Sequence, residues 1–532
     1  MNKRLSILVL IALPFLAVAQ PVKLWQNTFN GNLNGTDHAR SVISDAQGNV
    51  YVTGRSYHTT EEGNFTTIMY APSGTQRWAD HQADNELSVP NEGVKLAKDR
   101  FGNVYATGTL SIHSGDLAIL KYDANGRKWT KTYEHSIWGS AEDHGTDIGI
   151  DSIGNIYAIA YSQSTNGALL NTVMFKTDSA GNKLWSDDYD DGNSDDFTQG
   201  LAVTPRGNVF GLTNGSSFFG SGTMDINTIN YTANGQHNWV ARYDSPVSGE
   251  DFGRTIKAHP GGNQFIGGAA TTNSGTSMIA ICQNSYGTRL WTVLYNGSAN
   301  GDDTAIAIDY LSSRKAVMSG NTQETNGGIK TAITTLMADS GMTLWSRQYF
   351  GPDNLGAWIT GQTTDAAGNI YVCGYTQTNA ERKNGCILKY DHTGSLLWTI
   401  SFDAGTKTDD VFNAITLDPA GNILVTGYTA ASGGNTSYLT VKYAGSTTNV
   451  ADVSSGAQQL AVTPVPFTES VIIQHPEKGN VTMTDLLGRT VFSVYKEEES
   501  LQLTTTGISA GVYYIRFESR SGHILYRKAI KH

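Results

Sequence analysis

The sequence predicts an all-β protein, and three observations lead to that expectation. Tryptophan recurs at a nearly constant interval along most of the 532 residues, Gly is abundant (58) while Pro is scarce (12), and Tyr reaches 25. Repetition at such a period is typical of architectures built from one small supersecondary unit. Abundant Gly together with aromatic residues favours many short strands joined by tight turns.

Eight tryptophans mark the repeat. They are spaced 51 to 56 residues apart, and seven of them are followed four residues later by Phe or Tyr. Because side chains alternate along a strand, positions i and i+4 share one face, so each Trp and its aromatic neighbour belong to the buried side of a strand. The eight are Trp25, Trp78, Trp129, Trp185, Trp239, Trp291, Trp345 and Trp398.

Two glycine turns divide each repeat. One follows an apolar segment such as 119–122 and contains Asp123 and Gly126, and the other occurs in segments such as 45–54, Asp-Ala-Gln-Gly-Asn-Val-Tyr-Val-Thr-Gly. Asp accepts backbone hydrogen bonds in such a turn, and Gly takes the positive φ. The sixth copy of the second turn, 309–320, is degenerate and two residues longer. One repeat therefore predicts four strands, of which the Trp strand is the outermost.

Eight repeats of four antiparallel strands describe an eight-bladed β-propeller over residues 20–445, with a seven-bladed ring as the alternative. The strand of Trp25 has no partner before it, and the last repeat ends at 439–443 without a Trp strand of its own. We therefore expect the N-terminal strand to complete the final blade, which hides the sheet edges. The repeat resembles the SBBP type of bacterial β-propeller repeat, a resemblance that implies this fold and no single reaction.

The first residues resemble an export signal. Two basic residues precede the apolar run 5–18, and Ala-Val-Ala at 17–19 fits the small-x-small pattern of signal peptidase sites. A signal peptide over 1–19, cleaved before Gln20, is predicted. No later segment reaches the roughly 20 apolar residues that span a bilayer, so no transmembrane segment is expected.

Charge and cysteine content exclude further classes. The chain has 37 Lys+Arg and 48 Asp+Glu, a net charge of −11, without a Lys/Arg-rich run, which argues against a nucleic-acid partner. Cys282, Cys373 and Cys386 fit no zinc spacing. Cys373 and Cys386 could face each other across one hairpin, whereas buried free thiols are the favoured alternative.

A second composition begins near the C-terminus. A small, polar linker is expected at 446–461, followed at 462–532 by a small β-sandwich with alternating strands. The motif residues are Pro464, Pro466, Gly488, Arg489, Gly511, Tyr513, Lys528 and Lys531. The segment resembles the type A C-terminal sorting domain of the type IX (Por) secretion system of Bacteroidota, with Val465 where the family motif Pro-Asn-Pro has Asn. The resemblance implies the type IX machinery as a partner, passage of the outer membrane, and a secreted or surface-attached protein.

An acidic ladder stands eight residues before the second turn in most repeats. Such a ring of carboxylates could hold Ca²⁺. A residue repeated in nearly every blade more often accepts backbone hydrogen bonds, and we favour that reading. Asn91 and Ala357 replace Asp in two repeats, and Asp303 stands two residues out of register. The ladder comprises Asp37, Asp143, Asp196, Asp251, Asp303 and Asp410.

Two tryptophans lie outside the repeat. Trp138 precedes Asp143, and Trp358 follows Ala357, both on the side of the longer and more variable connections. An aromatic residue on a variable loop face could stack on a sugar or anchor a protein partner. Simple packing is the alternative.

These features favour a secreted or surface-displayed monomer that binds polysaccharide or a protein partner without catalysis. No His-x-x-x-His or His-Glu-x-x-His arrangement occurs. The alternative function is an extracellular hydrolase or lyase acting on polysaccharide, with its acidic residues on the variable face.

Overall fold

The computed structural model describes residues 20–58, 63–83, 90–111, 115–133, 143–163, 169–190, 195–216, 223–323, 330–379, 382–405, 408–431, 434–445, 460–465, 467–485, 490–520 and 524–531. The predicted signal peptide 1–19 and Trp138 lie outside these residues. The chain divides into two compact units, 1–447 and 448–532. No helix in the described part is long and apolar enough to cross a membrane.

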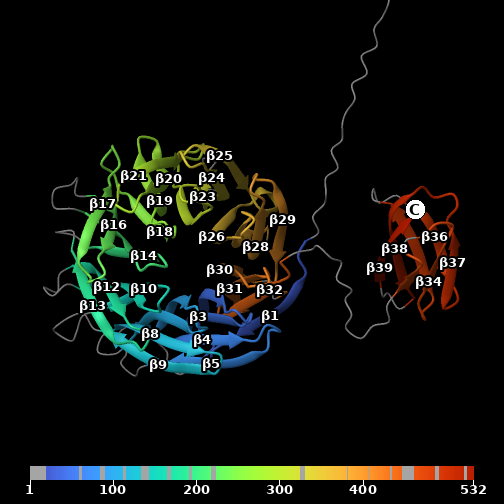
Figure 1. The fold of residues 1–532 in the computed structure, drawn as a ribbon, viewed down its shortest axis with the longest axis horizontal. Helices are drawn as coiled ribbons and strands as arrows, with labels where there is room; N and C mark the ends of the chain where they lie inside the picture. Colours follow the sequence, from blue (N-terminus) through green and yellow to red (C-terminus); the bar gives the residue numbers. More distant parts are fainter. Residues whose placement is uncertain are drawn as a thin grey trace, which may run out of the picture. The chain divides into compact units, whose positions relative to one another are not determined.

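The described strands of the first unit form eight four-stranded antiparallel sheets, arranged in a ring (Figure 1). The eight-bladed propeller is therefore confirmed. Blades 1 and 2 are β2 (His38–Ser44), β3 (Val50–Ser56), β4 (Asn64–Tyr70), β5 (Gln76–Gln82), and β6 (Glu92–Lys98), β7 (Val104–Leu110), β8 (Asp116–Asp123), β9 (Gly126–Tyr133). Blades 3 and 4 are β10 (Asp143–Ile150), β11 (Ile156–Gln163), β12 (Leu170–Thr177), β13 (Lys183–Tyr189), and β14 (Phe197–Val203), β15 (Val209–Gly215), β16 (Asp225–Tyr231), β17 (His237–Tyr243).

The second half of the ring repeats the same order of strands. Blades 5 and 6 are β18 (Phe252–Ala258), β19 (Gln264–Thr272), β20 (Gly275–Gln283), β21 (Arg289–Tyr295), and β22 (Thr304–Tyr310), β23 (Ala316–Gln323), β24 (Lys330–Met337), β25 (Thr343–Tyr349). Blades 7 and 8 are β26 (Ala357–Thr364), β27 (Ile370–Gln377), β28 (Lys383–Tyr390), β29 (Leu396–Phe402), and β30 (Asp410–Leu417), β31 (Ile423–Ala430), β32 (Thr436–Tyr443), β1 (Lys23–Phe29). A 3₁₀-helix, η1 (Pro352–Asn354), precedes blade 7.

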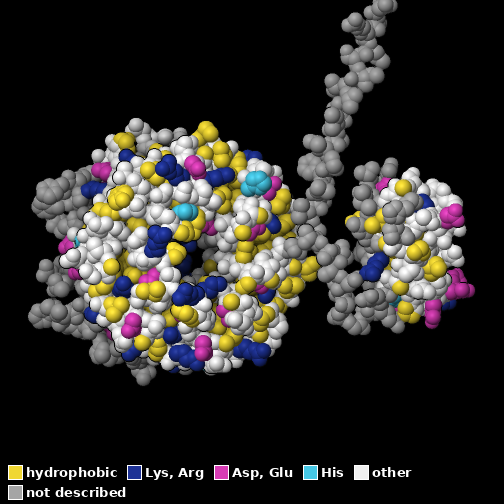
Figure 2. Space-filling view, in the orientation of Figure 1, with side chains coloured by type: hydrophobic (Ala, Val, Ile, Leu, Met, Phe, Trp, Pro, Cys, Tyr) yellow, Lys and Arg dark blue, Asp and Glu magenta, His cyan; other side chains and the backbone are white. Residues whose placement is uncertain are grey.

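Within a blade, the first strand lies nearest the centre of the ring and the Trp strand at the rim (Figure 1). The two middle strands are the most buried, as in β4, β7, β15 and β16, where every residue is buried. Their apolar side chains pack against the neighbouring blades on both faces, which explains why these segments read as continuous rather than alternating apolar runs. Figure 2 shows the face in view hollowed at the centre, with Lys and Arg side chains around the hollow.

The ring closes through its N-terminal strand, as the repeat register predicts. β1 pairs antiparallel with β32 and so supplies the outer strand of blade 8, with Gln26 opposite Val441 and Thr28 opposite Leu439. The Asp37 amide also donates to the Thr436 carbonyl (3.0 Å). Backbone hydrogen bonds between residues about 400 positions apart therefore join the two ends of the propeller, and β1 takes the place of β32 as the outer strand of blade 8.

Blades dock onto one another through the outer-strand tryptophans. The Trp25 indole N–H donates to the Pro72 carbonyl (3.0 Å), and Trp185 donates to Ala233 (3.0 Å), each acceptor being the second residue of a hairpin turn in the next blade. The turn glycine lies against the indole: a Cβ on Gly235, whose φ is 86°, would lie 2.5 Å from the Trp185 ring. Glycine is required there both for its backbone conformation and for the close approach. The same hydrogen bond is made by Trp78, Trp239 and Trp345, and for Trp239 and Trp345 the turn glycine also lies against the indole.

The three cysteines are free and buried. Cys373 pairs with Ile387 and Cys386 with Gly374, so the two cysteines are offset by one residue and project to opposite faces of the sheet. Burial raises the pKa of Cys282 and of Cys373 to about 12, which keeps both thiols protonated at neutral pH.

The second unit contains two small antiparallel sheets. The first consists of β33 (Ala461–Thr463), β34 (Ser470–Gln474) and β37 (Ser500–Thr504), and the second of β36 (Thr490–Lys496), β35 (Gly479–Asp485), β38 (Gly511–Ser519) and β39 (Ile524–Lys531). One apolar cluster is shared by both sheets and includes Val471, Ile473, Met483, Ile515 and Phe517, all fully buried. This unit therefore has its own core.

Replacing Trp25 tests the closure of the ring. Trp25→Ala removes the indole hydrogen bond to Pro72 and the contact with Tyr70, whose ring centre lies 5.8 Å away. The free energy of unfolding should fall by about 2–3 kcal/mol in chemical denaturation. Leu24, on the same strand but 51% exposed, is the matched control, and Leu24→Ala should change it by no more than about 0.5 kcal/mol. Equal effects of the two substitutions would contradict a closing role for this tryptophan.

Candidate functional site

The acidic ladder is buried rather than displayed at the channel mouth. Its carboxylates lie at or next to the start of the first strand of a blade, and all of them have 0% exposure. These residues are Asp37, Asp143, Asp196, Asp251, Asp303 and Asp410. A buried carboxylate needs hydrogen-bond donors around it, and the surrounding loop supplies them.

In three blades the ladder carboxylate forms a clip, in which its two oxygens accept amides from two separate segments of loop backbone. Asp37 Oδ2 accepts the Gly31 amide (2.5 Å), and Oδ1 accepts the Tyr57 amide (2.7 Å), six residues before and twenty residues after it. The same two bonds join Asp251 to Ser245 and Thr271, and Asp303 to Gly297 and Gln323. In these blades both carboxylate oxygens hold backbone, which is the structural role favoured from the sequence. Binding of Ca²⁺ by the ladder stays a prediction.

Two positions depart from the ladder sequence, and the structure explains both. Asn91 keeps half of the clip, since its Oδ1 accepts the Ser111 amide (2.7 Å). In blade 7, Ala357 has no side-chain acceptor, and the Gly356 carbonyl accepts the amide of Gln377 (3.1 Å), which lies twenty residues after Ala357. A backbone carbonyl therefore replaces the side chain there.

The expected register shift at Asp303 is wrong. Asp303 forms the clip bonds at the usual spacing, and the following turn begins at Leu311, whose amide donates to the Lys315 carbonyl (2.8 Å). The turn predicted to begin at Asp309 thus begins two residues later. With the turn placed at Leu311, all of the ladder positions have the same eight-residue spacing.

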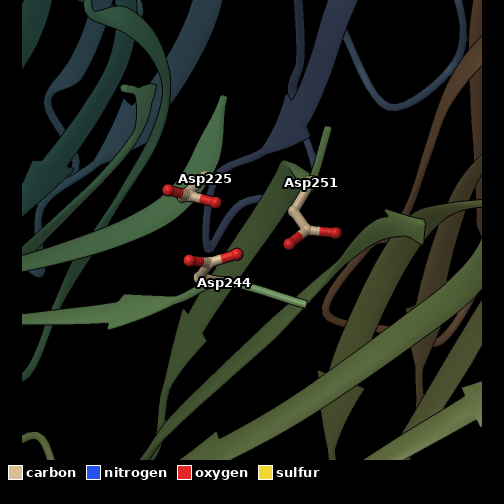
Figure 3. A group of neighbouring side chains, drawn as sticks. All are labelled: Asp225, Asp244 and Asp251. Atoms are coloured by element: carbon tan, nitrogen blue, oxygen red, sulfur yellow. The ribbon is translucent and has the colours of Figure 1, made fainter. Parts of the chain in front are cut away.

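One group of carboxylates among the described residues is close enough to share a cation. Asp225 begins β16, Asp244 follows β17 and Asp251 precedes β18, and one oxygen from each lies within 4.8 Å of the others. Figure 3 shows the three side chains converging from these elements. Sequence analysis had singled out Asp251 alone. Asp225 and Asp244 belong to no repeated motif, so only the fold brings them together.

The charge of this acidic group is already partly balanced. Arg242 forms an ion pair with Asp225, which is fully buried, and Asp251 accepts two backbone amides. Burial raises the pKa of Asp251 above its ordinary value, opposed by those amides, and the nearby Asp244 raises it further. Oxygen ligands suit Ca²⁺, but six to eight are typical and a cation here would compete with Arg242. The donor set therefore fits a calcium ion only in part.

Trp358 lies in blade 7, whereas the acidic group lies in blades 4 and 5. It is the second residue of β26, is partly exposed, and stacks on Tyr375 of β27 with ring centres 5.1 Å apart and planes 10° apart. The Lys383 ammonium lies 5.0 Å from the Tyr375 ring and 3.8 Å from Asp409. Trp358 belongs to none of the core clusters of the described residues. The result is an aromatic plate beside a cation, a pattern used to bind sugar rings and flat ligands.

The plate continues toward the neighbouring blades. Burial raises the pKa of Tyr375, and Tyr428 of blade 8 raises it further. The Tyr428 ring packs against the His38 ring of blade 1, with ring centres 4.6 Å apart. Sequence analysis found Trp358 because it breaks the repeat. It missed Tyr375 because tyrosine is common throughout the chain.

The described motif residues of the C-terminal unit lie in its last two strands and directly after β33. Tyr513 is buried, with its hydroxyl donating to the Ser509 carbonyl (2.6 Å), and Gly511 begins β38. Lys531 donates to the Thr468 carbonyl, and its ammonium lies 5.6 Å from the Phe467 ring. Pro464 follows β33, and Lys528 lies in β39. Pro466, Gly488 and Arg489 lie outside the described residues.

Residues 461–532 match the family described as the secretion system C-terminal sorting domain, of the Por type. The C-terminal unit is a sorting domain. The chain is thus a cargo of the type IX (Por) secretion system, and this domain implies interaction with that machinery, hence secretion or surface attachment. No curated protein sequence matches the chain.

Several solved structures share the β architecture at low identity. PorZ, described as an essential bacterial surface component of the type IX secretion system of Porphyromonas gingivalis, is 14% identical over 94% of this chain and 74% of its own, with a TM-score of 0.33. The β-propeller domain of the Trilobed protease from Pyrococcus furiosus is 8% identical over 69% of this chain and 96% of its own, with a TM-score of 0.35. The polysaccharide lyase Uly1 is 12% identical over 79% of this chain and 100% of its own, with a TM-score of 0.42. At these scores none of the three carries an argument about the activity of this chain.

The pH dependence of stability tests the buried clip at Asp251. Because burial raises its pKa in the folded state, the ionised carboxylate costs stability above that pKa, and the cost is relieved as the pH falls through it. Asp251→Asn does not titrate and loses one acceptor oxygen. We expect the wild-type protein to gain in free energy of unfolding relative to this variant as the pH falls from about 7 to about 4, measured by urea denaturation. If the free energy of unfolding of the wild type instead fell relative to that of the variant on acidification, the raised pKa would be contradicted.

Proposed function

We propose that the propeller is a non-catalytic binding module that the cell exports through the type IX system and that recognises a polysaccharide on its variable-loop face. The observation that supports this most directly is the partly exposed Trp358–Tyr375 stack, which no core requires. The sorting domain supports an extracellular place of action. A ring pair also occurs at the equivalent positions of blade 3, where His144 stacks on Tyr161, but only blade 7 has the larger indole there.

The chemistry of the plate suits a carbohydrate. Sugar rings present C–H faces that pack on aromatic surfaces, and their hydroxyls accept hydrogen bonds from cationic donors. Lys383 lies beside the plate, and Asp409, at 3.8 Å from it, can accept from a hydroxyl. A protein partner would use the same aromatic anchor, so it is the second outcome of the binding test.

The export route completes the proposal. The signal peptide predicted at 1–19 would bring the chain to the periplasm, and the sorting domain would direct it across the outer membrane. Surface attachment or release follows from the same domain. The propeller would then meet extracellular glycans as a folded monomer.

Binding to glycans tests the plate. The exported protein should bind at least one polysaccharide in a glycan screen without forming product, and Trp358→Ala should weaken that binding about tenfold or more, because an aromatic anchor is lost. Phe197 occupies the same repeat position in blade 4 and is 40% exposed, so Phe197→Ala is the matched control and should leave binding unchanged. Formation of a product would support the hydrolase or lyase alternative instead.

Deletion of the sorting domain tests the route. Without residues 461–532, the propeller should accumulate in the periplasm of the producing cell, whereas the full chain should be found at the surface or in the medium. Cell fractionation and immunoblotting would show this. Surface delivery of the deleted chain would contradict the proposed route.

A further inference from the structure

A pocket of about 260 Å³ lies between blades 4 and 5, on the outer flank of the ring. It is lined by the outer strand β17 and by the β20–β21 hairpin, and the residues used below are Trp239, Ala241, Tyr243, Gln283, Tyr286 and Arg289. It lies outside the Trp358 plate, which belongs to blade 7. Its position beside a tight turn was not expected from the sequence, which favoured the variable loops.

The pocket exists because two repeat positions are occupied by small side chains. Two residues after the outer-strand Trp, the other blades carry Asn, Asp, Lys, Asp, Val, Arg or Ile, whereas blade 4 has Ala241. At the end of the third strand, five blades carry Tyr, whereas blade 5 has Gln283. Between blades 1 and 2 these positions hold Asp80 and Tyr122, which fill the interface and share a hydrogen bond (3.0 Å). With Ala and Gln in their places, the corresponding space stays open.

A third departure from the repeat adds an aromatic rim. The third residue of the hairpin turn is Ser, Asn, Ala or Thr in the six other hairpins, and it is Tyr286 here, 80% exposed. Trp239 forms the floor, where its indole N–H is held by the Ser285 carbonyl (3.2 Å). Three substitutions that break the repeat therefore meet at one place. Residues that stabilise the ring recur from blade to blade. Three neighbouring positions that all depart from the repeat therefore indicate a role in binding a ligand.

The polar groups of the pocket define what it would hold. Gln283 is 4% exposed, and its Oε1 has no hydrogen-bond partner among the described residues, although a buried amide oxygen ordinarily has one. The Arg289 guanidinium lies 5.4 Å from the Tyr243 ring, and no described carboxylate lies within ion-pair distance of it. Arg242, by contrast, is already paired with Asp225. The pocket thus offers an acceptor for a hydroxyl, a free guanidinium for an oxyanion, and aromatic faces for a ring.

We propose that this pocket binds a single anionic sugar residue of a polysaccharide, with Arg289 on its carboxylate or sulfate, Gln283 Oε1 accepting from a hydroxyl, and Tyr286 against the ring. The volume lies below the roughly 300–1,000 Å³ of sites for drug-sized ligands, in keeping with one sugar unit. The proposal rests on the proposed function in that the ligand is a saccharide. It goes further by naming a second site and the charge of the sugar.

The test refills the pocket with the Asp–Tyr pair that occupies the equivalent positions between blades 1 and 2. Full-length exported protein is titrated calorimetrically with oligogalacturonate, with a sulfated oligosaccharide and with a neutral gluco-oligosaccharide. Wild type should prefer one of the two anionic ligands, which also identifies the anion. The double variant Ala241→Asp/Gln283→Tyr and the single variant Arg289→Gln should each weaken that binding about tenfold or more. Lys183→Gln, at the position equivalent to Arg289 in blade 3, should leave it within about twofold.

The melting temperature of the double variant should be no lower than that of the wild type. A loss of binding in this variant would then not be caused by unfolding. Anionic binding that persists in both pocket variants would overturn the proposal. If that binding is lost in Trp358→Ala instead, the proposed function stands and only the pocket is wrong. Equal affinity for the neutral ligand would also overturn the pocket, and failure to bind any saccharide would overturn both proposals.

Discussion

The propeller depends on the contact between one blade's outer-strand indole and the next blade's hairpin turn. Trp25, for example, combines a hydrogen bond to a turn carbonyl with burial of ring area against Tyr70. A single net hydrogen bond contributes only about 1 kcal/mol, but the contact recurs around the ring. It fixes the spacing and tilt of the blades, because the turn glycine lets the backbone approach the ring and any larger residue would separate them. The narrow range of tryptophan spacings in the chain reflects this geometric requirement.

Buried carboxylates provide the second repeated device. Asp37 and its equivalents bind loop amides that would otherwise be buried without partners, so the connections between blades become defined structures. Blade 7 shows that the requirement is for an acceptor and not for a charge, since the Gly356 carbonyl serves in place of a side chain. The first strand of blade 7 keeps the register of the others, and Trp358 directly follows the position at which the acceptor is replaced.

The two proposed binding sites both lie where residues depart from the repeat. A residue that holds the ring together is needed in every blade, whereas a ligand of this size touches only one or two blades. Recognition can therefore evolve where the repeat is broken, as at Trp358 or at the Ala241–Gln283 pair, provided that the tryptophan contact beneath is kept. Trp239 meets this condition, because it still donates to Ser285 at the floor of the pocket.

The sequence by itself determined the all-β class, the eight blades, the closing role of the Trp25 strand and the sorting domain. Each of these follows from local signals that repeat or form a contiguous motif: strand periodicity, turn glycines and a fixed interval. The tertiary structure alone decided which residues meet. Asp225 and Asp251 are 26 positions apart and share no motif, and Ala241 and Gln283 reveal a pocket only when adjacent blades are packed. The register of Asp303 was likewise settled by its hydrogen bonds. Contacts across blade interfaces depend on side-chain volumes from two distant repeats at once, and no single segment of the chain encodes them.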